Sequence, residues 1–310
     1  MAHRDVFLYS PKHHYTIPRD CPFYLDTSVL RRRATTLRGT LLAKQSYTSA
    51  LAIVELLARA RRSDRDYRPV RAALTAIFDT ELMIDWRMPD AQLRGAFPQS
   101  RPHVDIYDTR AESLRVIAGA VVKTATRAQF LHVASRLTVP QTIGFFEKYN
   151  SEVGEAYLAA LNSARRQSKM LFDPQSDMAT AVAQVFRLPP ELTHDDYIGA
   201  LRGSKINEAM SRWTIAEFAR EAENASPDEQ REYFMSYDGS IDSYLKALAW
   251  SHFDVVLGRT PGRNDVLDLL HLTYLVDGAH LVTGDRALAK LASAVGISVV
   301  GPESPLVGGA

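Results

Sequence analysis

Short apolar segments alternate with helical ones near both ends of this chain, and this alternation most constrains the fold. Apolar content and flanking turn residues predict strands at 22–26, 45–49, 279–285 and 297–302. Apolar periodicity and capping residues predict the helices that separate them, at 27–44, 50–62, 264–278 and 286–296. Such alternation is typical of an α/β protein in which helices cover both faces of a parallel sheet.

The middle of the chain has a different pattern. Between about 65 and 250, helical periodicity dominates, and breaks that contain proline separate the helices. We therefore predict one α/β domain formed by residues 1–64 and 251–310, with a long, mostly helical insertion at 65–250. An independent helical domain that docks on the α/β domain would give the same sequence pattern, so both arrangements stay open.

Composition limits the cellular setting more than the function. The formal net charge of +1 gives no signature of the whole protein, but residues 29–75 hold eleven basic residues and three acids. The one cysteine, Cys21, excludes an intramolecular disulfide and suits a reducing compartment. Residues 1–20 have no uninterrupted apolar core of signal-peptide length, and no run of eighteen apolar residues occurs. We expect a soluble cytoplasmic protein without membrane contact.

Carboxylates follow the predicted strands or begin the predicted helices. Asp26 closes the first strand, and Asp285 follows the strand near the C-terminus. Glu55 lies in the helix after the second strand, while Asp265 and Asp268 share one face of another helix. Because ligands bind beyond the carboxyl ends of parallel strands, these acids have a route to one rim. Like charges gathered there need a positive partner, and oxygen ligands suit Mg²⁺ or Mn²⁺.

Simpler explanations exist for individual acids. Asp26 and Asp285 each precede a helix, where an aspartate caps the first unpaired N–H groups. Asp265 lies in a first helical turn, where the helix dipole alone favours an acid. Glu55 is harder to explain because its neighbours are apolar, so that it needs a partner or a metal if it is buried. For His271 we favour a place in the core or behind the site.

Four motifs in this order resemble the PIN-domain family of metal-dependent ribonucleases. They are YLDTSVL around Asp26, TSALAIVELL around Glu55, NDVLDLLHLTYL around Asp268 and GAHLVTGDRAL around Asp285. The resemblance covers 20–62 and 262–302 and implies a Rossmann-like sheet with these acids around one or two divalent metals. It also implies that Ser28 supports a carboxylate or a metal-bound water, with Thr283 as a second candidate. Two departures are the long insertion and the ambiguity between Asp265 and Asp268, of which we favour Asp268.

The resemblance implies a divalent-metal-dependent endoribonuclease that acts on single-stranded or structured RNA. A nuclease directed at DNA and a non-catalytic binding module are the alternatives that the sequence leaves open. The basic stretch suits a phosphate backbone, so we expect Arg31, Arg59, Arg61 and Arg62 to bind substrate, although a solvated surface explains them equally well. A homo-oligomer and a small partner protein are both compatible with the sequence.

Overall fold

The computed structural model contains a five-stranded sheet in which every strand is parallel to its neighbours. The residues that it describes are 21–33, 36, 44–80, 82–97, 109–139, 141–149, 151–152, 154–155, 158–159, 180, 184, 226–256 and 263–302. The strands are β1 (Phe23–Leu25), β2 (Ser46–Ser49), β3 (Met83–Asp85), β4 (His280–Val282) and β5 (Val299–Val300). Their order is β3-β2-β1-β4-β5, so all carboxyl ends meet at one edge.

Segments far apart in the sequence form the centre of this sheet. Phe23 of β1 pairs with His280 of β4, and Leu25 pairs with Val282. On its other side β1 pairs with β2. The predicted α/β class and the parallel sheet are therefore confirmed, and three of its central strands come from segments near the two ends of the chain.

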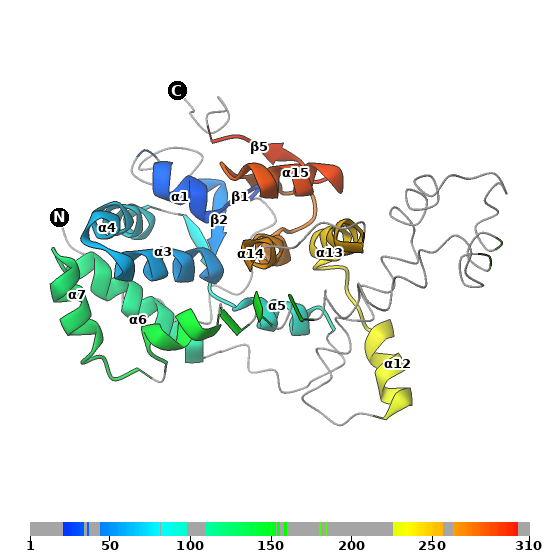
Figure 1. Cartoon of the computed structure of the whole chain (residues 1–310), viewed down its shortest axis with the longest axis horizontal. Coiled ribbons are helices and arrows are strands. Elements are labelled where there is room, and N and C mark those ends of the chain that lie inside the picture. The colour runs from blue at the N-terminus through cyan, green and yellow to red at the C-terminus, as the bar shows by residue number, and fades with distance from the viewer. Residues whose placement is uncertain are drawn as a thin grey trace.

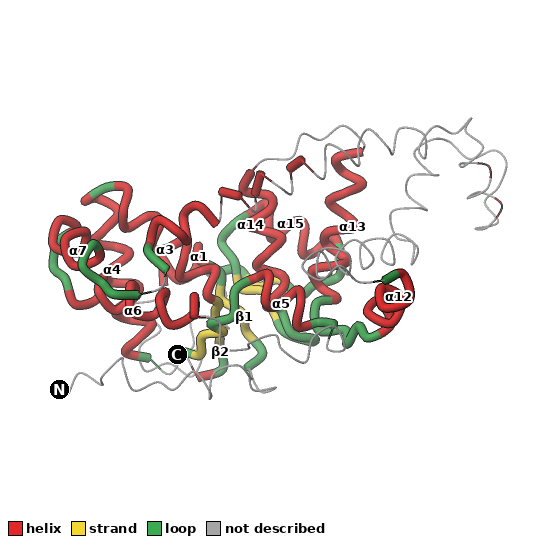
Figure 2. Tube along the Cα trace, turned by 90° about the horizontal axis from the view of Figure 1, so that it is seen from below, coloured by secondary structure: helices red, strands yellow, loops and turns green. Residues whose placement is uncertain are grey.

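Helices cover both faces of the sheet (Figures 1 and 2). The first face is covered by α1 (Thr27–Arg33), α3 (Ala50–Arg62), α4 (Asp64–Asp79), α6 (Thr109–Lys123) and α7 (Arg127–Ala134). The second face carries α5 (Pro89–Gly95), α13 (Asp242–Val256), α14 (Arg263–His271), which continues as the short 3-10 helix η5 (Leu272–Tyr274), and α15 (Arg286–Ala294). A further helix, α12 (Pro227–Met235), lies beyond α13 in Figure 1.

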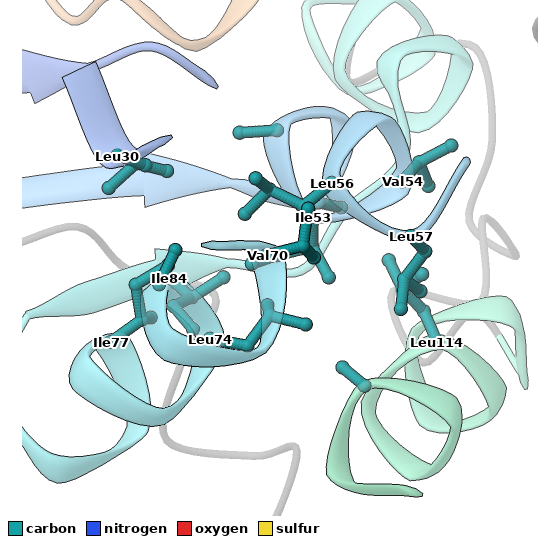
Figure 3. Close-up of a cluster of buried hydrophobic side chains, with 14 of the residues drawn as sticks. Leu30, Ile53, Val54, Leu56, Leu57, Val70, Leu74, Ile77, Ile84 and Leu114 are labelled. Atoms are coloured by element: carbon teal, nitrogen blue, oxygen red, sulfur yellow. The ribbon is translucent and has the colours of Figure 1, made fainter. Parts of the chain in front are cut away.

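The two cores follow from the alternation of side chains along the strands. Leu25 faces the first core, and Tyr24, its neighbour, faces the second, because successive residues of a strand point to opposite faces. In the first core, Ile53 and Leu56 of α3 pack between α4 and the sheet (Figure 3). Truncating a fully buried leucine such as Leu56 to alanine costs about 2–5 kcal/mol.

Strand β3 was not expected, because it lies inside the stretch for which the sequence predicts helices. Met83–Asp85 joins β2, with Ser49 opposite Asp85. Three residues are too few to show a period of two, so the helical pattern on either side dominates the sequence signal. The sheet thus takes a strand from within 65–250, and α4 packs on α1 and α3. The long helical insertion itself stays a prediction, since much of that stretch lies outside the described residues.

Capping side chains fix where the site-bearing helices begin. The Ser49 hydroxyl accepts a hydrogen bond from the Ala52 N–H at the start of α3. The Asp285 carboxylate accepts from the Ala287 and Leu288 N–H groups at the start of α15. Within the described parts of the chain, the model contains no helix with the length and apolar content to cross a membrane.

Candidate active site

Asp26 lies directly after β1, at the carboxyl edge of the sheet, and is buried. Its Oδ1 accepts hydrogen bonds from the Ser28 hydroxyl at 2.8 Å and from the Val29 N–H at 3.0 Å. The Thr283 hydroxyl donates to its Oδ2 at 2.6 Å. Asp26 therefore caps the start of α1, as the simpler explanation predicts, and it also binds the loop after β4.

That loop connects two of the predicted acids. The Gly284 N–H donates to the Ser28 hydroxyl at 2.7 Å, and the Asp285 N–H donates to the Thr283 hydroxyl at 2.9 Å. Asp285 is exposed and uses Oδ1 to cap α15. Ser28 and Thr283 thus hold the ends of β1 and β4 together, and both were named from the sequence as supports for a carboxylate.

Glu55 reaches the same edge from α3. Its Oε2 accepts a hydrogen bond from the Thr27 hydroxyl and lies 3.4 Å from His271 Nε2. His271 Nδ1 lies 2.6 Å from the Tyr24 hydroxyl, which in turn lies 2.8 Å from the Ser49 hydroxyl. A chain of polar groups therefore leads from the buried face of β1 to a carboxylate at the rim.

Asp268 and Asp265 lie on α14, next to the other acids. Burial raises the pKa of Asp268 to about 7, and although His271 opposes this, the charges of Asp285, Glu55 and Asp265 add to it. Among the described residues, none donates a hydrogen bond to the Asp268 carboxylate. The charges of Asp285, Glu55 and Asp265 therefore act on Asp268, and those of Glu55, Asp26 and Asp268 act on His271.

The remaining electrostatics point to a net excess of negative charge. Burial raises the pKa of Asp26, against the opposing effects of His271, Thr283 and Ser28. Burial would raise the pKa of Glu55 too, but His271 and Thr27 hold it below its ordinary value. For His271, burial favours the neutral form, yet the nearby acids, Glu55 first, raise its pKa above the usual range. The nearby acids therefore favour the protonated imidazole of His271, which faces several of them at once.

The donors suit a divalent cation by their chemistry, since carboxylate oxygens are the ligands that Mg²⁺ and Mn²⁺ prefer. In the part of the chain that the structure describes, no three His, Cys, Asp or Glu side chains are arranged as a ready-made metal site. The acids are instead held by hydrogen bonds: Asp26 to Ser28 and Thr283, and Glu55 to Thr27. Binding a cation would require some of these side chains to turn.

The arginines proposed to bind substrate do not behave alike. Arg59 lies one turn after Glu55 on the same face of α3, and its charge acts on that carboxylate. Arg31, on α1, is close enough to Arg59 for repulsion between them to contribute to a lowered pKa, after burial. Arg61 instead forms an ion pair with Glu147 at 2.6 Å, on the side of α7. Arg62 is exposed in the last turn of α3.

Sequence reasoning missed two groups at this edge. Thr27 and Tyr24 lie inside the YLDTSVL motif, but only the fold shows that their hydroxyls hold Glu55 and His271. His271 itself is buried, in agreement with the prediction, and contacts the site through Glu55. A tyrosine at the centre of an apolar strand carries no signal that its hydroxyl has a partner.

Comparison of this chain with protein-family models, with curated proteins and with solved structures gave no significant match. The resemblance to the PIN-domain family therefore stays a prediction that rests on the four motifs.

Proposed function

We propose that this protein is a divalent-metal-dependent nuclease that hydrolyses phosphodiester bonds in single-stranded or structured RNA. One observation carries the proposal: the carboxylates of Asp26, Glu55 and Asp268 come together from three elements with too little positive charge to balance them. Within the described residues, His271 is the one basic side chain that is hydrogen-bonded to any of the three. Acids gathered without such balance are typical of sites that bind a cation.

The residues of this chain have distinct tasks in such a site. Asp26, Glu55, Asp268 and Asp285 would hold Mg²⁺ or Mn²⁺, with Asp265 as the alternative acid on α14. A bound cation would supply Lewis-acid polarisation of a phosphate oxygen and would acidify a water molecule. Ser28 and Thr283 orient the Asp26 carboxylate, and they hold β1 against the loop after β4.

The preference for RNA rests on the resemblance to PIN-domain ribonucleases. The carboxylates would serve equally well for hydrolysis of DNA, because the same chemistry cleaves both backbones. Hydrolysis of labelled RNA and DNA of one sequence, compared in Mn²⁺ and in chelator, decides between them.

The test of the catalytic proposal replaces one charge and keeps the helix cap. Asparagine caps helices as well as aspartate does, so Asp26→Asn should preserve α1 while it removes a charge that holds the cation. We expect hydrolysis of labelled RNA in Mg²⁺ or Mn²⁺ to fall by about a thousandfold or more. Asp285→Asn should behave alike, and the double variant should lose little more than either single one, since residues at one metal act as a unit.

A matched control is Asp277→Asn, which changes an exposed aspartate just before β4, at the opposite edge of the sheet. It should retain full activity. Full metal-dependent hydrolysis by purified Asp26→Asn protein would overturn the catalytic role and leave Asp26 as a helix cap.

A further inference from the structure

Basic side chains of two neighbouring helices, α1 and α3, lie near the acidic edge. Arg31 and Arg32 are exposed in the last turn of α1, and Arg59 is half-buried in the last turn of α3. Helices α1 and α3 are in contact, so these three side chains come from neighbouring elements (Figure 1). The helix dipole favours a cation at the end of each helix, but it does not require that cations from two helices approach one another.

Arg32 lies directly over the loop after β4. A Cβ atom added at Gly284 would stand 3.1 Å from Arg32 Nη1 and 3.2 Å from the Ser28 hydroxyl. The Ser28 hydroxyl is the same group that donates to Asp26. The Arg32 guanidinium therefore lies beside Gly284, whose N–H donates to the Ser28 hydroxyl, and this hydroxyl donates in turn to Asp26.

Arg59 lies on α3, one turn beyond Glu55, and its charge acts on Glu55 and on Arg31. The described residues give no ion pair to Arg31, Arg32 or Arg59. Arg61, on a different face of the same helix, is paired with Glu147. Among the described residues, Arg31, Arg32 and Arg59 thus lack an ion-pair partner, and the charges of Arg32 and Arg59 act on Arg31. Arg61, in contrast, already has a carboxylate partner.

We propose that Arg31, Arg32 and Arg59 form a phosphate-binding surface that holds a nucleic-acid strand through its backbone across the acidic edge. This inference rests on the proposed function, because the acidic edge supplies the reason for a phosphodiester beside it. Three guanidinium groups from two neighbouring helices suit successive phosphates of one strand better than a single small phosphate. Arg61, which forms an ion pair with Glu147, is left out of the surface proposed here.

Binding in chelator tests this surface apart from catalysis. Fluorescence anisotropy with a labelled twenty-nucleotide RNA, and with DNA of the same sequence, measures affinity over a range of salt concentrations without any hydrolysis. The double variant Arg32→Gln, Arg59→Gln removes one charge from each of the two helices. We expect its affinity to fall at least tenfold and the slope of log K against log salt to shrink by about 1.4, since each contact with a single strand contributes about 0.7.

The matched control is the double variant Arg65→Gln, Arg68→Gln, which removes two exposed charges from α4. For this control, the slope of log K against log salt should differ from that of the unmodified protein by no more than about a third of the contribution of one contact. Equal losses in the two double variants would overturn the surface in favour of a general effect of net charge. So would an unchanged slope in the Arg32, Arg59 variant, or the absence of binding by the unmodified protein.

The two proposals can be contradicted independently of each other. If the unmodified protein binds RNA in chelator through these arginines but never hydrolyses it, the nuclease proposal fails and the surface stands. If Asp26→Asn abolishes hydrolysis while the Arg32, Arg59 variant binds normally, the surface fails and the nuclease proposal stands.

Discussion

Strands β1 and β3 both end in a buried aspartate at the same edge of the sheet, yet the two acids have opposite surroundings. Asp85, at the end of β3, accepts hydrogen bonds from the Arg87 N–H, Nε and Nη2 and from Gln92 Nε2. From the residues that the structure describes, Asp26 accepts hydrogen bonds only from hydroxyl groups and a backbone N–H. The charge of Asp85 is therefore balanced by an ion pair with Arg87. The positive partner nearest in effect to Asp26 is His271, on which Glu55 and Asp268 also act.

This difference shows that a strand ending in aspartate does not by itself mark a functional site. A buried carboxylate with a dedicated guanidinium is balanced, and it serves the fold. Buried carboxylates that share one imidazole carry a charge that the fold leaves uncompensated, which costs stability unless a ligand binds. The balance of charge around each acid separates the two cases, and it cannot be seen in the residues of the strand alone.

The largest expected effect distinguishes the two aspartates by stability. Asp85→Asn places an amide N–H₂ against the donors of Arg87 and Gln92 and removes the charge opposite Arg87. We expect the free energy of unfolding, measured by urea titration in chelator, to fall by about 2–3 kcal/mol. Asp26→Asn should leave this free energy unchanged or raise it, because it relieves repulsion among acids. Equal destabilisation of both variants would contradict the comparison.

Much of the fold was predictable from the sequence, and the reason lies in particular residues. Asp285 and Gly296 bracket a helix by capping, and PFYLD is an apolar run bounded by Pro22 and an acid. Ser28, one of the two hydroxyls that orient Asp26, was also named, because the resemblance to the PIN-domain family implies such a support at that position.

Contacts between distant residues were out of reach. The Tyr24 hydroxyl meets His271 across 247 positions, and Arg61 meets Glu147 across 86. Such pairs depend on how α3, α7 and α14 pack, so no local spacing predicts them. For the same reason the sequence grouped Arg61 with Arg59, although they point to different neighbours.

A smaller effect tests the excess charge through pH. The pKa of Asp268 is about 7 in the folded protein, against about 4 for an ordinary aspartate. Between these values the folded state holds a proton that the unfolded state has lost, so stability falls as pH rises from about 4 to about 7. Asp268→Asn removes this loss, and in chelator it should be more stable than the unmodified protein by about 2 kcal/mol at pH 8 and by much less at pH 4.

The exposed Asp277 again supplies the control, since Asp277→Asn should show little dependence of its stability difference on pH. Urea titrations at pH 4, 6 and 8 measure both variants. A difference for Asp268→Asn that stays constant over this range would contradict a pKa of Asp268 raised by burial and by the neighbouring acids.

The smallest effect concerns the imidazole that the acids share. Tyr24→Phe removes the hydroxyl that contacts His271 Nδ1 and leaves that nitrogen buried without this partner. We expect a loss of about 1–2 kcal/mol in the free energy of unfolding, because a buried polar atom loses its hydrogen bond. Tyr47→Phe is the matched control: its hydroxyl also lies in the second core, but it bonds the Tyr274 carbonyl and the Val276 N–H, away from the acids.

Both tyrosine variants should therefore lose similar stability, and the titration of His271 separates them. Nδ1 of a protonated imidazole is a donor that the Tyr24 oxygen accepts, so removing that oxygen disfavours the charged form and should lower the pKa of His271, measured by NMR. Tyr47→Phe should leave this pKa where it is. If neither variant moves it, the nearby acids set the charge of His271 without the tyrosine, and the buried hydroxyl contributes only packing and one hydrogen bond. A shift confined to Tyr24→Phe would instead mean that a buried hydroxyl of the second core helps to set the charge of His271, and through it the charge balance among the acids. Asp85 has no such dependence, because its charge is balanced directly by Arg87.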